Sequence, residues 1–204
     1  MGGVLVDVNR DRAIHNFKVI GVTDADKLID VYHHKGLFFD FENGDIDGDE
    51  FCRILCKLVG KFIPQKDIRN AWTSMIDPPP IYKLEYLKEL RQTYKLFLLT
   101  NNNPFIISWA CSPNFTTSGS LSSFFEKIYV SYQMKCMKPG LKIFQMMIKD
   151  AEINPAESLF IDDSDKNILA ASSCGMNVLL VKNGSDWRNE LNAIIKTHTP
   201  VLDD

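Results

Sequence analysis

The sequence lacks the features that mark several classes of protein. It contains no run of about 18 apolar residues, so it predicts no membrane-spanning helix. It has no excess of positive charge, because 23 Lys and Arg stand against 26 Asp and Glu, and this argues against nucleic acid or an acidic membrane as a partner. Its five cysteines are odd in number and form no Cys-x-x-Cys pair, which predicts reduced thiols in a cytoplasmic protein.

What is present is the composition of an ordinary globular protein. The 204 residues are 45% hydrophobic and 24% charged, which suffices for one domain with a sizeable insert or for two small domains. With polyanions disfavoured, a small-molecule role is the natural expectation. The sequence leaves open whether the protein is a monomer or a homodimer.

The chain changes character at a run of three prolines. From residue 11 to about residue 77 the apolar residues recur at helical spacing, as Phe51, Ile54 and Leu58 illustrate. Pro78–Pro80 end this pattern, because proline lacks an amide hydrogen and pushes the preceding residue out of the helical region. We therefore expect a short first segment, a helical unit and a second domain, at residues 1–10, 11–77 and 78–204.

After the prolines, short apolar runs alternate with amphipathic segments. The runs that predict buried strands are residues 95–99, 127–131, 158–161 and 178–181. The segments that predict helices are residues 82–94, 139–151, 167–174 and 187–196. Strands separated by helices imply an α/β fold with a doubly wound parallel sheet, whose chemistry lies beyond the carboxyl ends of the strands.

Polar side chains follow three of these strands at that edge. Thr100 and Asn101 come after the first strand, Lys138 follows the second, and Asp162 and Asp163 end the third. A hydroxyl and an amide can donate to phosphate oxygens, a lysine supplies positive charge, and a carboxylate can bind Mg²⁺. Each element alone is also common in turns and helix caps. Their combination predicts a phosphate site with a magnesium ion.

These residues resemble the motifs of the haloacid dehalogenase-like hydrolase superfamily, over almost the whole chain. Within it the sequence is most similar to the small sugar-phosphate phosphatases, of the glucose-1-phosphatase-like kind, that carry a helical cap. Three of the family's four motifs are matched, by Leu98–Asn101, Met137–Pro139 and Phe160–Asn167. The resemblance implies magnesium-dependent hydrolysis of a small phosphorylated metabolite through an aspartyl-phosphate, with residues 11–77 as the cap.

The resemblance also implies a role for each matched residue. Lys138 and Thr100 would act in catalysis and, with Asn101, would bind the phosphate. The Mg²⁺ ligands would be Asp163 and the main-chain carbonyl of Gly2, supported by Asp162 and Asn167.

The first motif departs from the family pattern. Gly2–Asp7 matches its second half, and Met1 falls on a variable position, so the nucleophilic aspartate and its strand would lie just before Met1. Two explanations stay open: a chain truncated at its N-terminus, inactive as written, or a pseudo-enzyme that binds a phosphorylated ligand without cleaving it. A 2-haloacid dehalogenase is a further alternative, although that chemistry does not need the metal that Asp162 and Asp163 suggest.

Three other patterns occur in the helical unit. Residues 43–54 resemble a calcium-binding loop, but Ile54 stands where a bidentate glutamate is required, so we predict a turn and a helix cap. Cys52 and Cys56 lack a second ligand pair for zinc. The candidates for substrate specificity, or for a merely solvated face, are His15, His33, His34 and Lys35.

Overall fold

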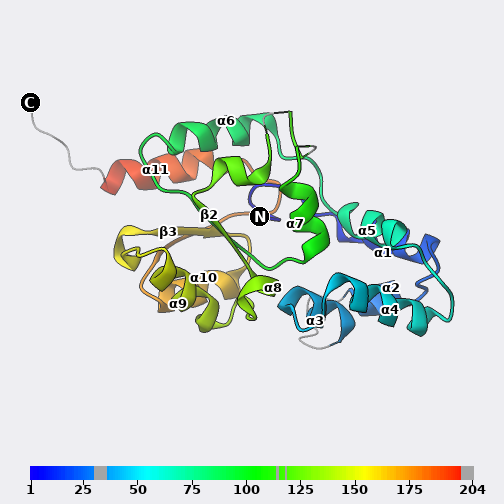
Figure 1. The fold of residues 1–204 in the computed structure, drawn as a ribbon. Helices are drawn as coiled ribbons and strands as arrows, with labels where there is room; N and C mark the ends of the chain where they lie inside the picture. Colours follow the sequence, from blue (N-terminus) through cyan, green and yellow to red (C-terminus); the bar gives the residue numbers. More distant parts are fainter. Residues whose placement is uncertain (30–35, 114, 118, 199–204) are drawn as a thin grey trace, which may run out of the picture.

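The computed structural model describes the chain except for residues 30–35, 114, 118 and 199–204. Helices α6 and α11 cover one side of the strands, helices α9 and α10 cover the other, and α1 to α5 project from one end (Figure 1). The strands are β1 Phe97–Thr100, β2 Lys127–Val130, β3 Leu159–Asp162 and β4 Asn177–Leu180. The predicted alternation of strands and helices after the prolines is confirmed.

The strands form two separate parallel pairs. Strand β1 pairs with β2, with Phe97 opposite Lys127, and β3 pairs with β4, with Leu159 opposite Asn177. Among the described residues no strand joins the two pairs, so the sheet is not continuous. The facing edges of β1 and β3 therefore lack a ladder partner in the part of the chain that the structure describes.

The helices around the strands include two that the sequence did not predict. These are α7 and α8, short helices that directly follow strand ends. Asn103 caps α7, because its side-chain Oδ1 accepts hydrogen bonds from the main-chain nitrogens of Phe105 and Ile106. The helices of this part are α6 Ile81–Leu90, α7 Pro104–Ala110, α8 Ser131–Met134, α9 Leu141–Asp150, α10 Asp165–Ser173 and α11 Arg188–His198, with 3₁₀ turns at Leu121–Phe124 and Pro155–Glu157.

The helical unit packs around a cluster of aromatic rings. Phe38 stacks on Trp72 at 4.6 Å between ring centroids, and Phe41 stacks on Phe51 at 4.5 Å. Phe105 of α7 contacts Phe41 at 4.9 Å and so ties this cluster to the strand-bearing part. The helices are α1 Arg10–Val19, α2 Ala25–Leu28, α3 Leu37–Asn43, α4 Gly48–Val59 and α5 Gln65–Thr73.

The turn at the start of α4 fits its predicted structural role. The side chain of Asp47 accepts a hydrogen bond from the main-chain nitrogen of Glu50 at 2.8 Å, and Gly44 adopts the left-handed conformation that ends α3. This loop therefore caps two helices, as the missing glutamate ligand at Ile54 led us to expect.

The first eight residues form a folded loop in the middle of the molecule (Figure 1). The carbonyl of Val4 accepts two hydrogen bonds of 2.8 Å, from Nζ of Lys83 and Nε1 of Trp187. Lys83 is fully buried, and Val6 is fully buried as well. The loop is thereby fixed between helix α6 and the segment that leads into α11.

The composition predicted reduced cysteines and no membrane-spanning helix. All five cysteines are free thiols. Within the described ranges, no helix combines the length and the apolar character needed to cross a bilayer.

Candidate functional site

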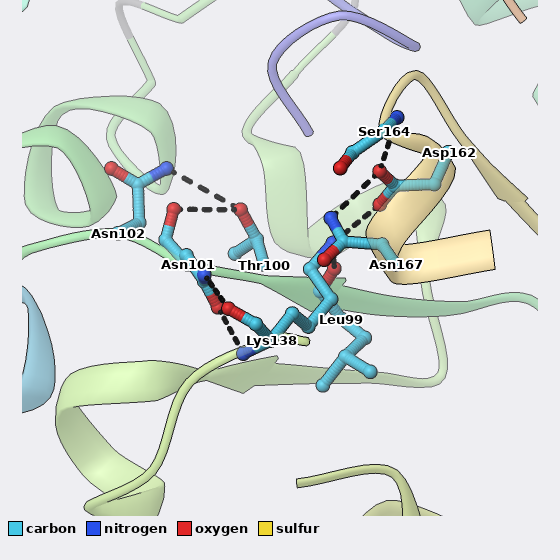
Figure 2. A network of polar contacts seen from close by, with 8 residues as sticks. All are labelled: Leu99, Thr100, Asn101, Asn102, Lys138, Asp162, Ser164 and Asn167. Atoms are coloured by element: carbon cyan, nitrogen blue, oxygen red, sulfur yellow. Dashed lines mark hydrogen bonds and ion pairs between the residues drawn. The ribbon is translucent and has the colours of Figure 1, made fainter. Parts of the chain in front are cut away.

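The carboxyl ends of the strands carry a buried ion pair. Lys138 Nζ donates to Oδ2 of Asp162 at 2.6 Å and to the carbonyl of Leu99 at 3.1 Å (Figure 2). Both charged side chains are only 6% exposed. Burial raises the pKa of Asp162, but the charge and hydrogen bond of Lys138 outweigh it, so the carboxyl has a pKa below its usual value. An ammonium has three donors, so one N–H of Lys138 is left for a ligand.

The side chain of Asn101 makes two hydrogen bonds to the main chain of Lys138. Its Nδ2 donates to the Lys138 carbonyl at 2.8 Å, and its Oδ1 accepts from the Lys138 amide at 2.9 Å (Figure 2). This pair of hydrogen bonds fixes the loop on which the lysine stands. The structure therefore shows Asn101 as a residue that positions Lys138, and phosphate binding by its second amide hydrogen stays a prediction.

Asp162 is fully occupied by protein contacts. While Oδ2 receives Lys138, Oδ1 accepts from the Ser164 amide at 3.0 Å and from Nδ2 of Asn167 at 2.8 Å. These contacts occupy both oxygens of Asp162 and leave Asp163 as the available carboxylate. A supporting role of Asp162 and Asn167 in metal binding stays a prediction.

Asp163 is exposed and lies against the N-terminal loop. A Cβ on Gly3 would fall 2.0 Å from Oδ2 of Asp163, so only glycine fits there, and Gly3 also has a positive φ of 78°. Partial desolvation and the neighbouring negative charge of Asp162 raise the pKa of Asp163, although the N-terminal amine and Lys138 oppose the shift.

This donor set suits magnesium. A hard carboxylate oxygen from Asp163 and the carbonyl of Gly2, next to Gly3, are the ligand types that Mg²⁺ takes, and it commonly keeps several waters. Among the described residues no group of three His, Cys, Asp or Glu side chains comes together.

Thr100 is buried but only weakly held. Its hydroxyl contacts the Asn101 carbonyl at 3.4 Å and Nδ2 of Asn102 at 3.5 Å, both at the long limit for a hydrogen bond. The predicted site did not include Ser131, whose Oγ accepts from the Asn102 amide at 3.0 Å and donates to the Glu42 carbonyl at 2.6 Å. Its position as the last residue of the predicted strand 127–131 was the available signal. Ser131 thus joins the Thr100 loop to α3.

The main-chain nitrogen of Met1 lies in the same site. Burial and then the charge of Lys138 lower the pKa of this α-amino group to about 5, while Asp162 and Asp163 oppose the shift. The start of the loop thus stands beside the lysine and the aspartate pair.

The cap candidates give a mixed result. His15 lies on α1 with an exposed side chain, whereas His33, His34 and Lys35 lie outside the described residues. Another residue of the helical unit, Glu42 of α3, has a shifted pKa that no sequence pattern had indicated. Burial raises the pKa of Glu42 to about 7, and the nearby Asn103 amide opposes this rise without reaching good hydrogen-bond geometry.

Comparison with known proteins defines the class. The sequence pattern of the haloacid dehalogenase-like hydrolases matches residues 80–181. A D-ribitol-5-phosphate phosphatase of Bacteroides thetaiotaomicron is 40% identical over 197 residues, which is 96% of each chain. The chain therefore belongs to the haloacid dehalogenase-like hydrolase family, and the predicted resemblance is confirmed.

Solved structures agree with this assignment. A predicted haloacid dehalogenase-like hydrolase of Porphyromonas gingivalis is 38% identical, covers 96% of this chain and 94% of its own, and superposes with a TM-score of 0.92. A family enzyme of B. thetaiotaomicron, solved with magnesium and inorganic phosphate, is 36% identical with a TM-score of 0.86, covering 93% of this chain and 95% of its own. The predicted α/β fold class is confirmed.

Proposed function

We propose that this protein is a magnesium-dependent phosphatase that cleaves phosphate monoesters of small polyhydroxylated metabolites. The observation that carries the proposal is the buried Lys138, held by Asp162 and Asn101, at the same sheet edge as the exposed carboxylate of Asp163. A cation and a metal-binding carboxylate at one sheet edge suit a phosphate dianion. The names of the relatives, a polyol-phosphate phosphatase and an enzyme solved with magnesium and phosphate, point the same way.

The residues of the site would have three roles, which are phosphate binding, metal binding and positioning. Lys138 and the hydroxyl of Thr100 would bind phosphoryl oxygens and stabilise the charge on them in the transition state. Asp163 and the Gly2 carbonyl would hold Mg²⁺, which when bound supplies further positive charge to the same oxygens. Asp162, Asn101 and Asn167 keep these groups in place.

The attacking carboxylate would come from an aspartate joined to Met1 on its N-terminal side. The Met1 nitrogen is buried beside Lys138, so a residue bonded to it would lie within the site. A carboxylate oxygen of that aspartate would form a bond to phosphorus while the bond from phosphorus to the ester oxygen breaks, and the leaving oxygen would take a proton from water to give the alcohol. Water would then hydrolyse the acyl-phosphate to free phosphate and aspartate. Substrate choice would rest on α1 to α5 as the cap.

The test uses the chain preceded by an apolar strand that ends in aspartate. We expect phosphate release from a panel that includes D-ribitol-5-phosphate and sugar phosphates, dependent on magnesium, and about a 100-fold or greater loss in Lys138→Met. Lys142→Met, an exposed lysine of α9, is the matched control. Tight phosphate binding without turnover would instead support a phospholigand-binding protein, and halide release from 2-haloacids would support a dehalogenase. Either outcome overturns the proposal.

A further inference from the structure

The hydroxyl of Ser131 lies between the helical unit and the loop that carries Thr100. Ser131 is the first residue of α8, directly after β2, and its side chain is fully buried. Its Oγ donates to the Glu42 carbonyl at 2.6 Å and accepts from the Asn102 amide at 3.0 Å. The side chain of Asn102 in turn directs its Nδ2 toward the Thr100 hydroxyl, 3.5 Å away (Figure 2). One side chain thus connects α3 to the candidate phosphate site.

Ser131 has a single hydroxyl hydrogen and two carbonyl oxygens within reach. The Glu42 carbonyl at 2.6 Å is the closer acceptor, and the Asn102 carbonyl lies at 3.2 Å. A hydroxyl donates one hydrogen, so it serves one of these carbonyls at a time. With α3 in place the hydrogen goes to the shorter contact. If α3 withdrew, the hydrogen would turn to the Asn102 carbonyl, and the loop would lose this link to the helical unit.

Further contacts hold α3 against α8, beside which it lies (Figure 1). Lys135 Nζ donates to the Gly44 carbonyl at the end of α3, and a Cβ added to Gly44 would fall 2.1 Å from the Tyr132 carbonyl oxygen. The side chain of Asn103 is fully buried, and among the described residues its Nδ2 has no hydrogen-bond partner, although the Glu42 carboxyl lies near. A buried donor without a partner is costly, so this Nδ2 would gain from a closer approach of α3. The junction is tightly packed, yet one of its hydrogen bonds is unmade.

We propose that Ser131 is a positioning residue that couples the docking of α3 to phosphate binding at Thr100 and Lys138. The inference rests on the proposed function for the phosphate itself. Because Ser131 holds the Asn102 amide, the loop keeps the conformation that presents the Thr100 hydroxyl. A phosphate bound to that hydroxyl stabilises this conformation, and the loop then favours the position of α3 that Ser131 joins to it. Such coupling is reciprocal, so docking of α3 strengthens phosphate binding by the same factor.

The first experiment follows amide hydrogen exchange with magnesium present, with and without saturating inorganic phosphate. We expect phosphate to slow exchange at residues 41–45 about tenfold relative to α1 of the same unit, because these amides open when α3 leaves α8. In Ser131→Ala this effect should fall below about twofold, and the phosphate Kd should rise about threefold to tenfold. The matched control is Lys135→Met, which loosens α3 without touching the Asn102 loop. It should exchange faster than the wild type but keep its response to phosphate.

A second measurement checks that the variants fold. Ser131→Ala leaves the buried Asn102 amide without its partner, so its Tm should fall by about 2–8 °C. If this variant does not fold, Ser131→Cys, which keeps the size but donates only weakly, is compared in the same way and should lose most of the phosphate effect.

The coupling and the proposed function fail in different ways. Equal phosphate protection of residues 41–45 in the wild type and the Ser131 variant would overturn the coupling alone, as would a complete loss of the response in Lys135→Met. Calorimetric titration of the wild type with inorganic phosphate tests the site itself. A wild type that binds no phosphate would reject the proposed function and this inference together.

Discussion

Lys138 and Asp162 join the two halves of the sheet. The lysine follows β2 and the aspartate ends β3, and their side chains meet at 2.6 Å with 6% exposure each. The pair therefore links the carboxyl ends of β1 and β3, between which the described residues provide no ladder hydrogen bonds. The same contact that holds the site's cation also sets the distance between the strand pairs at that edge.

Removing one partner of this pair should cost more stability than removing both. Lys138→Met leaves a buried carboxylate without its cation, and we expect the free energy of unfolding to fall by about 3–5 kcal/mol. The double variant with Asp162→Leu removes the stranded charge as well and should recover much of that loss. Urea unfolding of the wild type, both single variants and the double variant at pH 7 measures the coupling. Additive effects of the two single changes would show that the pair is not coupled.

The half-buried Glu42 carboxyl should make stability depend on pH. Its pKa in the folded protein is about 7, above the ordinary value of 4.5, so the native state binds more protons than the unfolded state. The free energy of unfolding should therefore fall as the pH rises from 4.5 through 7, by up to about 3 kcal/mol. Glu42→Gln should remove this loss, which urea titrations at pH 5 and pH 8 would detect. The control is Glu85→Gln, an exposed glutamate of α6, which should leave the difference between the two pH values unchanged.

The positions of the strands could be predicted from the sequence because each strand is a short apolar run. The apolar run that ends at Thr100 and the run that ends at Asp162 each predicted a buried strand, and the structure places β1 and β3 there. The sequence could not show that the strands form two separate pairs, because burial on both faces says nothing about which neighbour supplies the hydrogen bonds. Helix α7 was missed because Asn103 and Pro104 indicated only the end of a strand, although they also begin a helix.

The site residues, like the strands, were predictable where the signal was local. Thr100, Lys138 and Asp162 were predicted to meet because parallel strands end at one edge, and the structure brings them together (Figure 2). The hydrogen bonds from the Asn101 side chain to the Lys138 main chain were not predictable. Lys138 lies 37 positions away, and no local sequence pattern indicates a contact between a side-chain amide and a distant loop. The roles assigned to these residues in binding phosphate and metal remain predictions.

Asn101 should act on phosphate binding through Lys138. Asn101→Ala removes both hydrogen bonds to the Lys138 main chain, so the lysine loses its fixed position, and we expect phosphate to bind about tenfold more weakly. Calorimetric titration with inorganic phosphate in the presence of magnesium measures this. Asn177→Ala is a matched control, because that side chain makes its hydrogen bonds to Ala156 and Ser158 at the opposite end of the strands. An unchanged phosphate Kd in Asn101→Ala would contradict the positioning role.

The contact between Gly3 and Asp163 gives the sharpest test of the metal site. In Gly3→Ala the new methyl group would fall 2.0 Å from the carboxylate oxygen of Asp163, so the carboxylate must leave its present position beside the N-terminal loop. Gly60→Ala is the matched control, because Gly60 has a similar positive φ of 76° and a methyl group added there would meet nothing within 4 Å. Both variants should lose about 1–2 kcal/mol of stability from backbone strain. Only Gly3→Ala should weaken magnesium binding, by about tenfold or more, in calorimetric titration with MgCl₂. Equal magnesium affinity in the two variants would show that Asp163 does not hold the ion at this place.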